Sequence, residues 1–402
     1  MQYPQRRRRF VALLDDRDHL PHVVEVEKQR IVGVDVRAVG AVDGEQPTAG
    51  DRVGCELAGT RIDPMHSGRR SRLGLGHSDE CRDAAPVATL RRVDSVAVGL
   101  VAGYAADRML GDPRRFHPVA GLGRILGSLE RELYRDTRSA GVAYAAVAVG
   151  GMGLASALVT RRLRSIEPVL VATATWAVLG GTTLAGVGEQ MADNLDAGDI
   201  DAARALIPSL CGRDPRSLDA DGMCRAAVES IAENTSDATV APVVWGAVAG
   251  VPGLVAYRTV NTLDAMVGYR SARYLNFGWA SARFDDLANV VPARLSGLLV
   301  VVLGPDPASS WAAWHRDAGK HPSPNAGVVE ASFAGALGIG LGGRTVYAHG
   351  EEMRPQLGSG PAPGSQDLRA AVRLSRRVQT GTVVVAVGYR LLRAVFSRRS
   401  AG

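Results

Sequence analysis

Two long uncharged runs, separated by a short basic turn, most constrain how this chain can fold. Residues 140–160 and 168–188 contain no charged side chain, and ArgArgLeuArg lies between them at 161–164. About 20 apolar residues are enough for a helix to cross the hydrocarbon core of a bilayer. The many small residues in both runs favour close helix packing in lipid. The pair therefore predicts a helical hairpin in a membrane, with a buried hairpin in a large soluble protein as the alternative.

Several shorter apolar stretches extend this pattern, and together they predict four to six membrane spans. They are interrupted by charges, Pro or Gly, and they occupy residues 93–106, 241–257, 290–304, 331–343 and 379–396. The fold class we expect is an all-α, polytopic helical membrane protein with polar helices and loops between the spans. Residues 350–367 are rich in Gly, Pro and Ser, which predicts an exposed loop.

The orientation in the membrane is harder to predict, because Arg residues occur in three successive connecting regions. These regions are 107–139, 161–164 and 258–283. Short loops rich in Arg and Lys favour the cytoplasmic side. The three regions can share one side only if 241–257 re-enters or 93–106 does not span.

The first 92 residues differ in character from the rest of the chain. They are polar and Arg-rich and lack a hydrophobic period, which predicts a disordered or loosely structured extension. A small independent domain and non-native sequence from an upstream start are the alternatives. The basic run at 6–9 is followed by too few apolar residues for a signal peptide. We therefore place the membrane domain at residues 93–402.

Composition excludes several classes of function. The net charge is only +6, aromatic residues make up 5%, and basic residues are scattered among acidic ones, so nucleic-acid binding is not indicated. The four cysteines, at 55, 81, 211 and 224, form no CxxC pair, so neither a zinc site nor a disulfide framework is predicted.

Acidic and amide residues crowd both sides of the apolar segment 241–257. Arg225, Glu229, Glu233 and Asp237 recur every four residues, so they share one helix face. Ionisable groups beside membrane sequence are costly and commonly functional. The carboxylates of Glu229, Glu233 and Asp237 suit Mg²⁺, but they suit a substrate ammonium or a general base equally well. A solvated face with ion pairs is the alternative. The other polar residues of this region are Asn234, Asn261, Asp264, Arg283, Asp285, Asp286 and Asn289.

Two turns carry residues typical of anion binding. The first, GDPRRFHPV, begins at residue 111 and contains Asp112, Arg114, Arg115 and His117. Guanidinium groups in a loop hold phosphate or carboxylate, although the same groups can face lipid headgroups. The second turn, KHPSPNAG, contains Lys320, Ser323 and Asn325. No Walker A, GxGxxG, GxSxG or HExxH pattern is present, so no known loop identifies a nucleotide or a reaction.

Five motifs in this order resemble those of the adenosylcobinamide-phosphate synthases, the CobD/CbiB-type membrane proteins of cobalamin biosynthesis. The motifs are GDPRRFHPV (111–119), ESIAENTSDATVAP (229–242), YRTVNTLDAMVGYRSARYLNFG (257–278), ARFDDLANVVPARL (282–295) and HPSPNAG with Glu330 (321–330). The resemblance covers about residues 95–400. One departure is Ser236–Thr239, where Val or Ile before the Asp and Gly after it would be typical.

The resemblance implies an acid–amine ligase in the cell membrane. It would join the free propionate of adenosylcobyric acid to (R)-1-amino-2-propanol or its O-phosphate, with ATP and Mg²⁺. The implied partners are these substrates and the lipid bilayer, with association with other cobalamin-assembly enzymes as a further expectation. A membrane scaffold or a transporter of corrinoid intermediates is the alternative, although the inverted repeat that transport predicts is not visible.

The resemblance also implies roles for individual residues. The expected catalytic or amine-binding residues are Glu233, Asp237, Asp264 and Asp285. The expected substrate- or phosphate-binding residues are Asp112, Arg114, Arg115, His117, Asn234, Asn261, Arg283, Lys320, Ser323 and Asn325. If 241–257 crossed the bilayer, the polar clusters on its two sides would face opposite compartments. A single site therefore predicts that 241–257 is re-entrant or deeply kinked.

Overall fold

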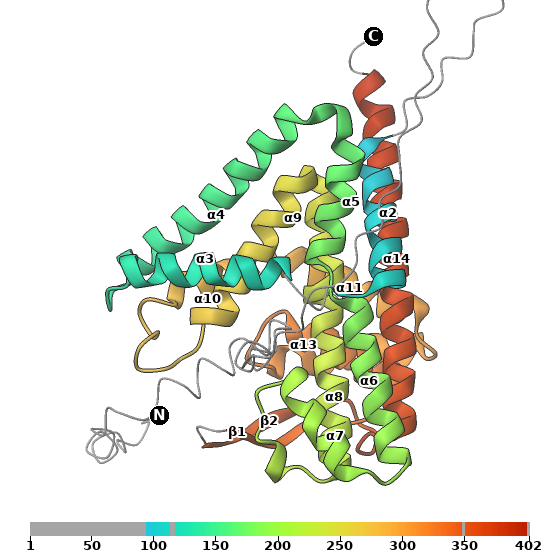
Figure 1. Ribbon diagram of the computed structural model, residues 1–402. Helices are drawn as coiled ribbons and strands as arrows, with labels where there is room; N and C mark the ends of the chain where they lie inside the picture. The colour runs from blue at the N-terminus through green and yellow to red at the C-terminus, as the bar shows by residue number, and fades with distance from the viewer. Residues whose placement is uncertain (1–93, 113–116, 348–349, 400–402) are drawn as a thin grey trace, which may run out of the picture. The chain divides into compact units, whose positions relative to one another are not determined.

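The computed structural model describes residues 94–112, 117–347 and 350–399 (Figure 1). The predictions about residues 1–92 lie outside this range, as do Cys55, Cys81, Arg114 and Arg115. The α-helices are α2 (Ser95–Leu110), α3 (Pro118–Leu133), α4 (Arg138–Arg162), α5 (Glu167–Val178), α6 (Gly181–Asp196), α7 (Ile200–Leu206), α8 (Ala220–Thr235), α9 (Ala241–Val267), α10 (Trp279–Ala288), α11 (Val290–Leu303), α12 (Pro307–Asp317), α13 (Ala326–Leu337) and α14 (Ser365–Arg399).

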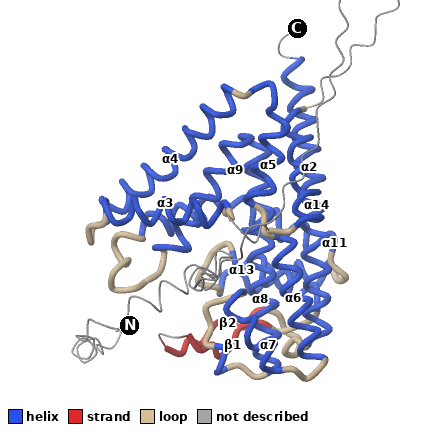
Figure 2. The backbone as a smooth tube through the Cα atoms, in the orientation of Figure 1, coloured by secondary structure: helices blue, strands red, loops and turns tan. Residues whose placement is uncertain are grey.

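Short elements complete the described chain. A π-helical turn (Ser236–Val240) joins α8 to α9, and 3₁₀ turns lie at Arg164–Ile166, Ile207–Ser209, Pro215–Ser217 and Ala318–Lys320. Two antiparallel strands, β1 (Leu341–Tyr347) and β2 (Gly350–Leu357), form a small hairpin that contacts α8, α12 and α13 (Figure 2). The prediction of an exposed loop at 350–367 is therefore wrong for its first half, where pairing with β1 turns a Pro-containing segment into an edge strand.

The all-α membrane architecture predicted from the sequence is confirmed. In the described residues, three helical segments are long and apolar enough to span: Arg138–Arg162, Arg164–Asp196 and Ala220–Val267. A fourth is obtained if Trp279–Ala288 and Val290–Leu303, bent by 44°, form one span. The structure therefore has three candidate spans, or four if the bent pair is one span. Only the count of four reaches the lower limit of the predicted four to six. Helix α2 has 16 residues and α13 has 12, and the final apolar run carries Arg390 and Arg393.

The two long uncharged runs do form consecutive helices, but they do not pack on each other as a simple hairpin. Helix α4 packs along α9, whereas α5 packs against α2 and α9. The two meet only at their connecting end (Figure 1). Gly103 on α2 allows close approach to α5, since an added Cβ would lie 2.5 Å from the Cβ of Thr175. The second run is also broken at Leu179, whose ψ of 156° ends α5 before α6 begins.

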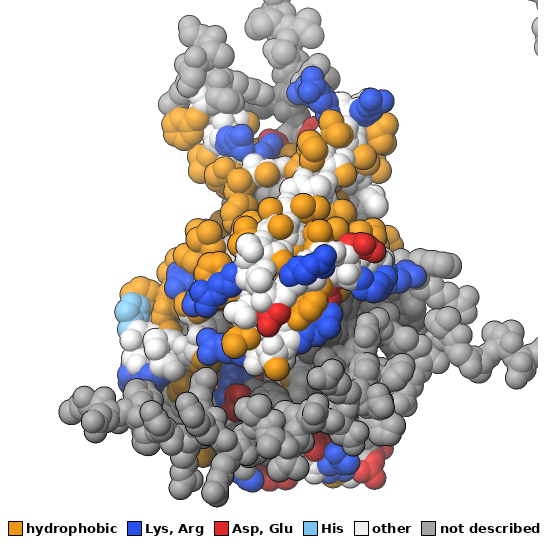
Figure 3. Space-filling model, turned by 90° about the vertical axis from the view of Figure 1, so that its left-hand side faces the viewer, with side chains coloured by type: hydrophobic (Ala, Val, Ile, Leu, Met, Phe, Trp, Pro, Cys, Tyr) orange, Lys and Arg blue, Asp and Glu red, His pale blue; other side chains and the backbone are white. Residues whose placement is uncertain are grey.

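Large apolar side chains are exposed on α4 and on the C-terminal part of α14. Leu154 is 63% exposed and Leu392 is 61% exposed. On the face shown in Figure 3, apolar side chains gather over the upper part, and basic side chains lie above them and along their lower edge. An apolar surface bordered by basic residues is what a lipid-facing region requires.

The segment 241–257 reverses direction at Gly250, as the requirement for one site predicted. Gly250 has φ 64° and ψ −143°, a conformation open essentially to glycine, and Pro252 follows at the start of the returning helix. A Cβ at Gly253 would meet the carbonyl oxygen of Trp245. In a straight helix these residues would be about 12 Å apart. The two arms of α9 therefore lie against each other.

Candidate functional site

An acidic pocket of about 210 Å³ lies where α8, the returning arm of α9, α10 and the 321–326 loop meet. We call it the acidic pocket. Five carboxylates line it, and its lining includes no Lys, Arg or His. The lining residues are Glu233, Ser236, Asp237, Asp264, Ala282, Asp285, Asp286, Asn289, Ser323, Asn325, Ala326 and Val329.

The reversal of α9 brings the first two groups of acids together. Asp237 lies 13 residues before Gly250, and Asp264 lies 14 residues after it. At 1.5 Å per residue the two arms are about 20 Å and 21 Å long, so the two carboxylates return to the same level. Glu233 lies one helical turn before Asp237 on the outgoing arm. Residues far apart in sequence therefore line one pocket.

The junction of α10 and α11 positions the third carboxylate. Asn289 donates from Nδ2 to Asp285 Oδ2 at 3.0 Å, and Tyr257 donates its hydroxyl to Asn289 Oδ1 at 2.9 Å. The other oxygen, Asp285 Oδ1, is buried and has no hydrogen-bond partner among the described residues. A buried carboxylate oxygen without a donor is a site for a cation or a proton.

The 321–326 loop closes one side of the acidic pocket. Ser323 Oγ accepts from the backbone N–H of Ala326 at 3.2 Å, which caps the start of α13. Asn325 donates from Nδ2 to the carbonyl of Asp286 at 2.7 Å and accepts from Arg294 Nη1 at 2.5 Å. These bonds hold Ser323 and Asn325 at the rim of the pocket.

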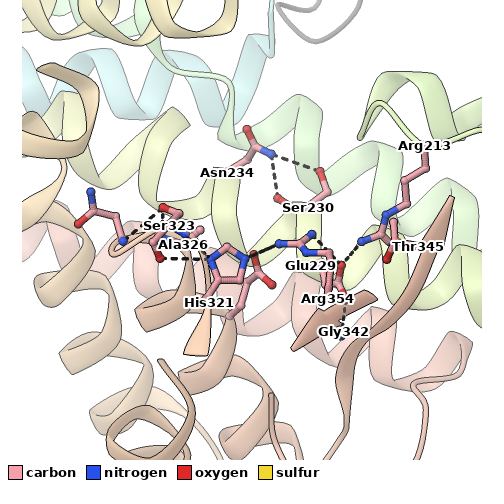
Figure 4. Close-up of polar contacts among 12 residues, drawn as sticks. Arg213, Glu229, Ser230, Asn234, His321, Ser323, Ala326, Gly342, Thr345 and Arg354 are labelled. Atoms are coloured by element: carbon pink, nitrogen blue, oxygen red, sulfur yellow. Dashed lines mark hydrogen bonds and ion pairs between the residues drawn. The ribbon is translucent and has the colours of Figure 1, made fainter. Parts of the chain in front are cut away.

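A second group of buried charges, the arginine network, lies beside the acidic pocket (Figure 4). It consists of Arg213, Glu229, His321, Glu330 and Arg354. Glu229 pairs with Arg213, accepts from the Gly342 N–H at 2.7 Å and lies 3.4 Å from Arg354 Nη1. Arg354 Nη2 contacts His321 Nε2 and lies 3.4 Å from Glu330 Oε1. The network ties α8, α13 and the β-hairpin together.

Burial sets the protonation of two members of this network. Burial and, after it, the positive charge of Arg354 together lower the pKa of His321 to about 4. The ring is therefore neutral, with Nε2 facing Arg354 and with Nδ1 3.1 Å from the Ser323 carbonyl oxygen and 3.0 Å from the Ser323 backbone nitrogen. Burial raises the pKa of Glu330, and the nearby guanidinium of Arg354 opposes that effect.

The structure brings together six of the predicted site residues. Glu233, Asp237, Asp264, Asp285, Ser323 and Asn325 all line the acidic pocket. Asn261 is not part of the pocket lining and accepts from Arg258 Nη1 at 3.4 Å, and Arg283 lies 3.2 Å from Asp286. Asn234 instead donates to the Ser230 carbonyl at 2.9 Å. Lys320 pairs with Asp317 at 2.7 Å. Asp112 and His117, 3.9 Å apart, lie outside the pocket lining.

The structure separates the members of the predicted metal set, because Glu233 and Asp237 line the acidic pocket and Glu229 does not. No group of three His, Cys, Asp or Glu side chains in the described residues is arranged to hold a metal ion. Glu229 belongs to the arginine network, where its oxygens already contact two guanidinium groups and a backbone N–H. The four-residue spacing correctly predicts one stripe along α8, but the stripe serves two different sites.

The partners of Glu229 could not be predicted from the sequence. Arg213 lies 16 residues before it and Arg354 lies 125 residues after it. Neither Arg stands in a motif that indicates ion pairing. His321 and Glu330 do lie in the HPSPNAG motif, but their joint contact with Arg354 depends on the β-hairpin.

Comparison with known proteins identifies the family. The CobD/Cbib protein family model matches residues 100–375. The "Cobalamin biosynthesis protein CobD" of Mycobacterium tuberculosis (strain CDC 1551 / Oshkosh) is 54% identical over 296 residues, covering 72% of this chain and 95% of the relative. The protein of that name from Chromobacterium violaceum is 43% identical over 281 residues, covering 67% and 89%. The one from Rhodobacter capsulatus is 40% identical over 300 residues, covering 72% and 96%.

No solved structure matches the chain. The family match covers more than half of the chain and includes every residue that lines the acidic pocket. The chain belongs to the CobD/Cbib protein family.

Proposed function

We propose that this protein acts in cobalamin biosynthesis as an acid–amine ligase at the plasma membrane. The substrates are adenosylcobyric acid and (R)-1-amino-2-propanol or its O-phosphate, and the product is the corresponding cobinamide. The observation that carries this proposal is the acidic pocket, in which five carboxylates surround about 210 Å³ without a basic side chain. A pocket of this size and charge suits a small organic ammonium.

The reaction requires activation of the corrinoid carboxylate, because oxide is a poor leaving group. In the proposed scheme a carboxylate oxygen attacks the γ-phosphorus of ATP, and ADP leaves. The amine nitrogen then attacks the acyl carbon, forming the C–N bond as inorganic phosphate leaves. The ammonium must first lose a proton, and a carboxylate of the acidic pocket can accept it. Glu233 and Asp264 are our candidates for this role.

The acidic pocket also fits Mg²⁺ in its usual coordination with a nucleotide. Mg²⁺ binds through one or two carboxylates together with substrate phosphates, so a preformed set of three carboxylates is not required. The unpartnered Oδ1 of Asp285 makes this residue, with Asp237, the candidate ligand. Bound Mg²⁺ would neutralise the charge of the phosphates.

The proposal is tested with purified protein in detergent. Adenosylcobyric acid, ATP, Mg²⁺ and each form of the amine are supplied, and cobinamide formation is measured. We expect product from the wild type and a loss of roughly 100-fold or more in Asp264→Asn. Product without a sealed compartment also separates catalysis from transport. Full activity of Asp264→Asn removes its proposed role, and no product with either amine contradicts the proposed reaction.

A further inference from the structure

A second pocket, of opposite charge, adjoins the acidic pocket. It measures about 440 Å³ and is lined by Arg294, Trp314, His315, Ala318, Gly319, His321, Pro322, Pro324 and Val328. We call it the basic cleft. Its lining includes no carboxylate, whereas the lining of the acidic pocket includes five carboxylates and no basic group.

The two pockets share a wall at one hydrogen-bonded pair. Arg294 lines the basic cleft and donates to Asn325, which lines the acidic pocket. Ser323 and Asn325 face the acidic pocket, while Pro322 and Pro324 of the same loop face the basic cleft. A ligand bound in the basic cleft can therefore extend over Asn325 toward the carboxylates.

The basic cleft holds an aromatic surface in a fixed position. Trp314 packs over Gly297 of α11, where an added Cβ would lie 2.8 Å from Trp314 Cζ3. The rings of Trp314 and His315 are 5.8 Å apart between centroids. His315 Nδ1 bonds the Trp311 carbonyl at 2.9 Å, which leaves Nε2 available to a ligand. An indole held in this way can stack on a planar base.

We infer that the basic cleft binds a nucleoside triphosphate, with the base on Trp314 and the phosphates beside Arg294. The inference rests on the proposed function, because that reaction needs a nucleotide. Ligand sites for molecules of this size measure about 300–1,000 Å³, so the acidic pocket alone is too small. Its carboxylates can approach phosphate only through a bound Mg²⁺, because they repel phosphate directly. The basic cleft supplies the missing volume and a guanidinium that matches phosphate geometry.

The test measures nucleotide binding separately from catalysis. ATP is titrated into the purified protein in detergent, and binding is followed by isothermal calorimetry. Arg294→Gln removes a charged hydrogen-bond donor, and we expect affinity to fall roughly 10- to 100-fold. Trp314→Leu removes the stacking surface, and we expect a fall of about 5- to 100-fold. In the activity assay the KM for ATP rises in both variants. In Trp314→Leu, which leaves the bond from Arg294 to Asn325 intact, the KM for the amine changes little.

Matched controls come from the same helix. Trp311→Leu changes a tryptophan that does not line the basic cleft, and Arg316→Gln changes an exposed arginine outside it that pairs with Asp317. Both are expected to bind ATP as the wild type does. If Trp311→Leu weakens binding as much as Trp314→Leu, the aromatic cluster acts through packing and the inference fails. Unchanged ATP affinity in Arg294→Gln also overturns it.

Three further outcomes distinguish a nucleotide from a lipid headgroup as the ligand and separate this inference from the proposed reaction. If anionic phospholipid in nanodiscs displaces ATP from the wild type but not from Arg294→Gln, a lipid headgroup is the true ligand and the inference fails. If ATP binding depends on Arg294 but no cobinamide forms, the nucleotide site stands and the proposed reaction fails. If cobinamide forms normally in both cleft variants, the reaction stands and this site fails.

Discussion

Glu229 and Glu233 lie one helical turn apart on α8, yet their surroundings are opposite. Glu229 contacts Arg213, Arg354 and the Gly342 N–H. Glu233 lines a pocket whose lining includes four more carboxylates and no basic side chain. The first charge is neutralised by the protein itself. The second charge remains available to a ligand. Two glutamates on one stripe of α8 therefore differ in role: Glu229 has a structural position, and Glu233 has a functional one.

The largest effect should come from removing the available charge. Glu233→Gln keeps the shape of the side chain and removes a carboxylate that we expect to bind or deprotonate the amine. Cobinamide formation should fall by about 10²- to 10⁴-fold. The unfolding temperature in detergent should not fall, because the substitution decreases the repulsion among the pocket carboxylates. A lower unfolding temperature with unchanged activity would assign Glu233 to the framework.

Removing the neutralised charge of Glu229 should have the opposite result, because stability should fall while activity is retained. Glu229→Gln leaves Arg213 without the carboxylate that it pairs with, while Arg354 keeps its contact with Glu330. Breaking a buried ion pair in this way costs about 3–5 kcal/mol. We expect a lower unfolding temperature, with the rate per folded molecule retained. Asp193→Asn is the control, since the exposed pair of Asp193 with Arg369 should contribute only about 0–1 kcal/mol. Lost activity at wild-type stability would extend the active site to the arginine network.

The reversal that joins the two arms of α9 gives a third test. Gly250→Ala places a side chain at φ 64° and ψ −143°, which should cost about 1–3 kcal/mol in backbone strain. The nearest atom to the new Cβ would be 3.7 Å away, so the expected loss is not due to a clash. The control is Gly151→Ala in the middle of α4, which meets no atom within 4 Å and should be neutral or stabilising. The measurement is the unfolding temperature of both variants.

The last effect concerns acid stability and is smallest at neutral pH, because it develops only as the pH falls below about 6.5. The pKa of His321 is lowered to about 4 in the folded protein, against about 6.5 in an unfolded chain. Between these values the unfolded chain takes up a proton that the folded protein does not, so stability decreases as pH falls from 6.5 toward 4. The contribution is at most about 1.4 kcal/mol per pH unit. His321→Asn should unfold with a weaker pH dependence in this range, and an unchanged pH profile would show that the ring is not held neutral.

The sequence predicted much of the membrane part and half of the site. Runs without charge predicted α4, and the four-residue spacing predicted the carboxylate stripe, because both signals are local. The break between α5 and α6 was not predicted, since Leu179 and Gly180 lie within an uninterrupted apolar run. The neutralisation of Glu229 and the pairing of Lys320 with Asp317 depend on how distant elements pack. Such contacts leave no periodic pattern in the chain.

The two arms of α9 have nearly equal lengths, and this restricts where residues can be inserted into or deleted from the protein. Asp237 and Asp264 meet because 13 and 14 residues separate them from Gly250. A single inserted residue in either arm would shift its carboxylate by about 1.5 Å along the helix and turn it by about 100°. Engineered loops or tags should therefore be placed outside 237–264, whereas paired changes that lengthen both arms by whole turns are the only ones expected to preserve the pocket.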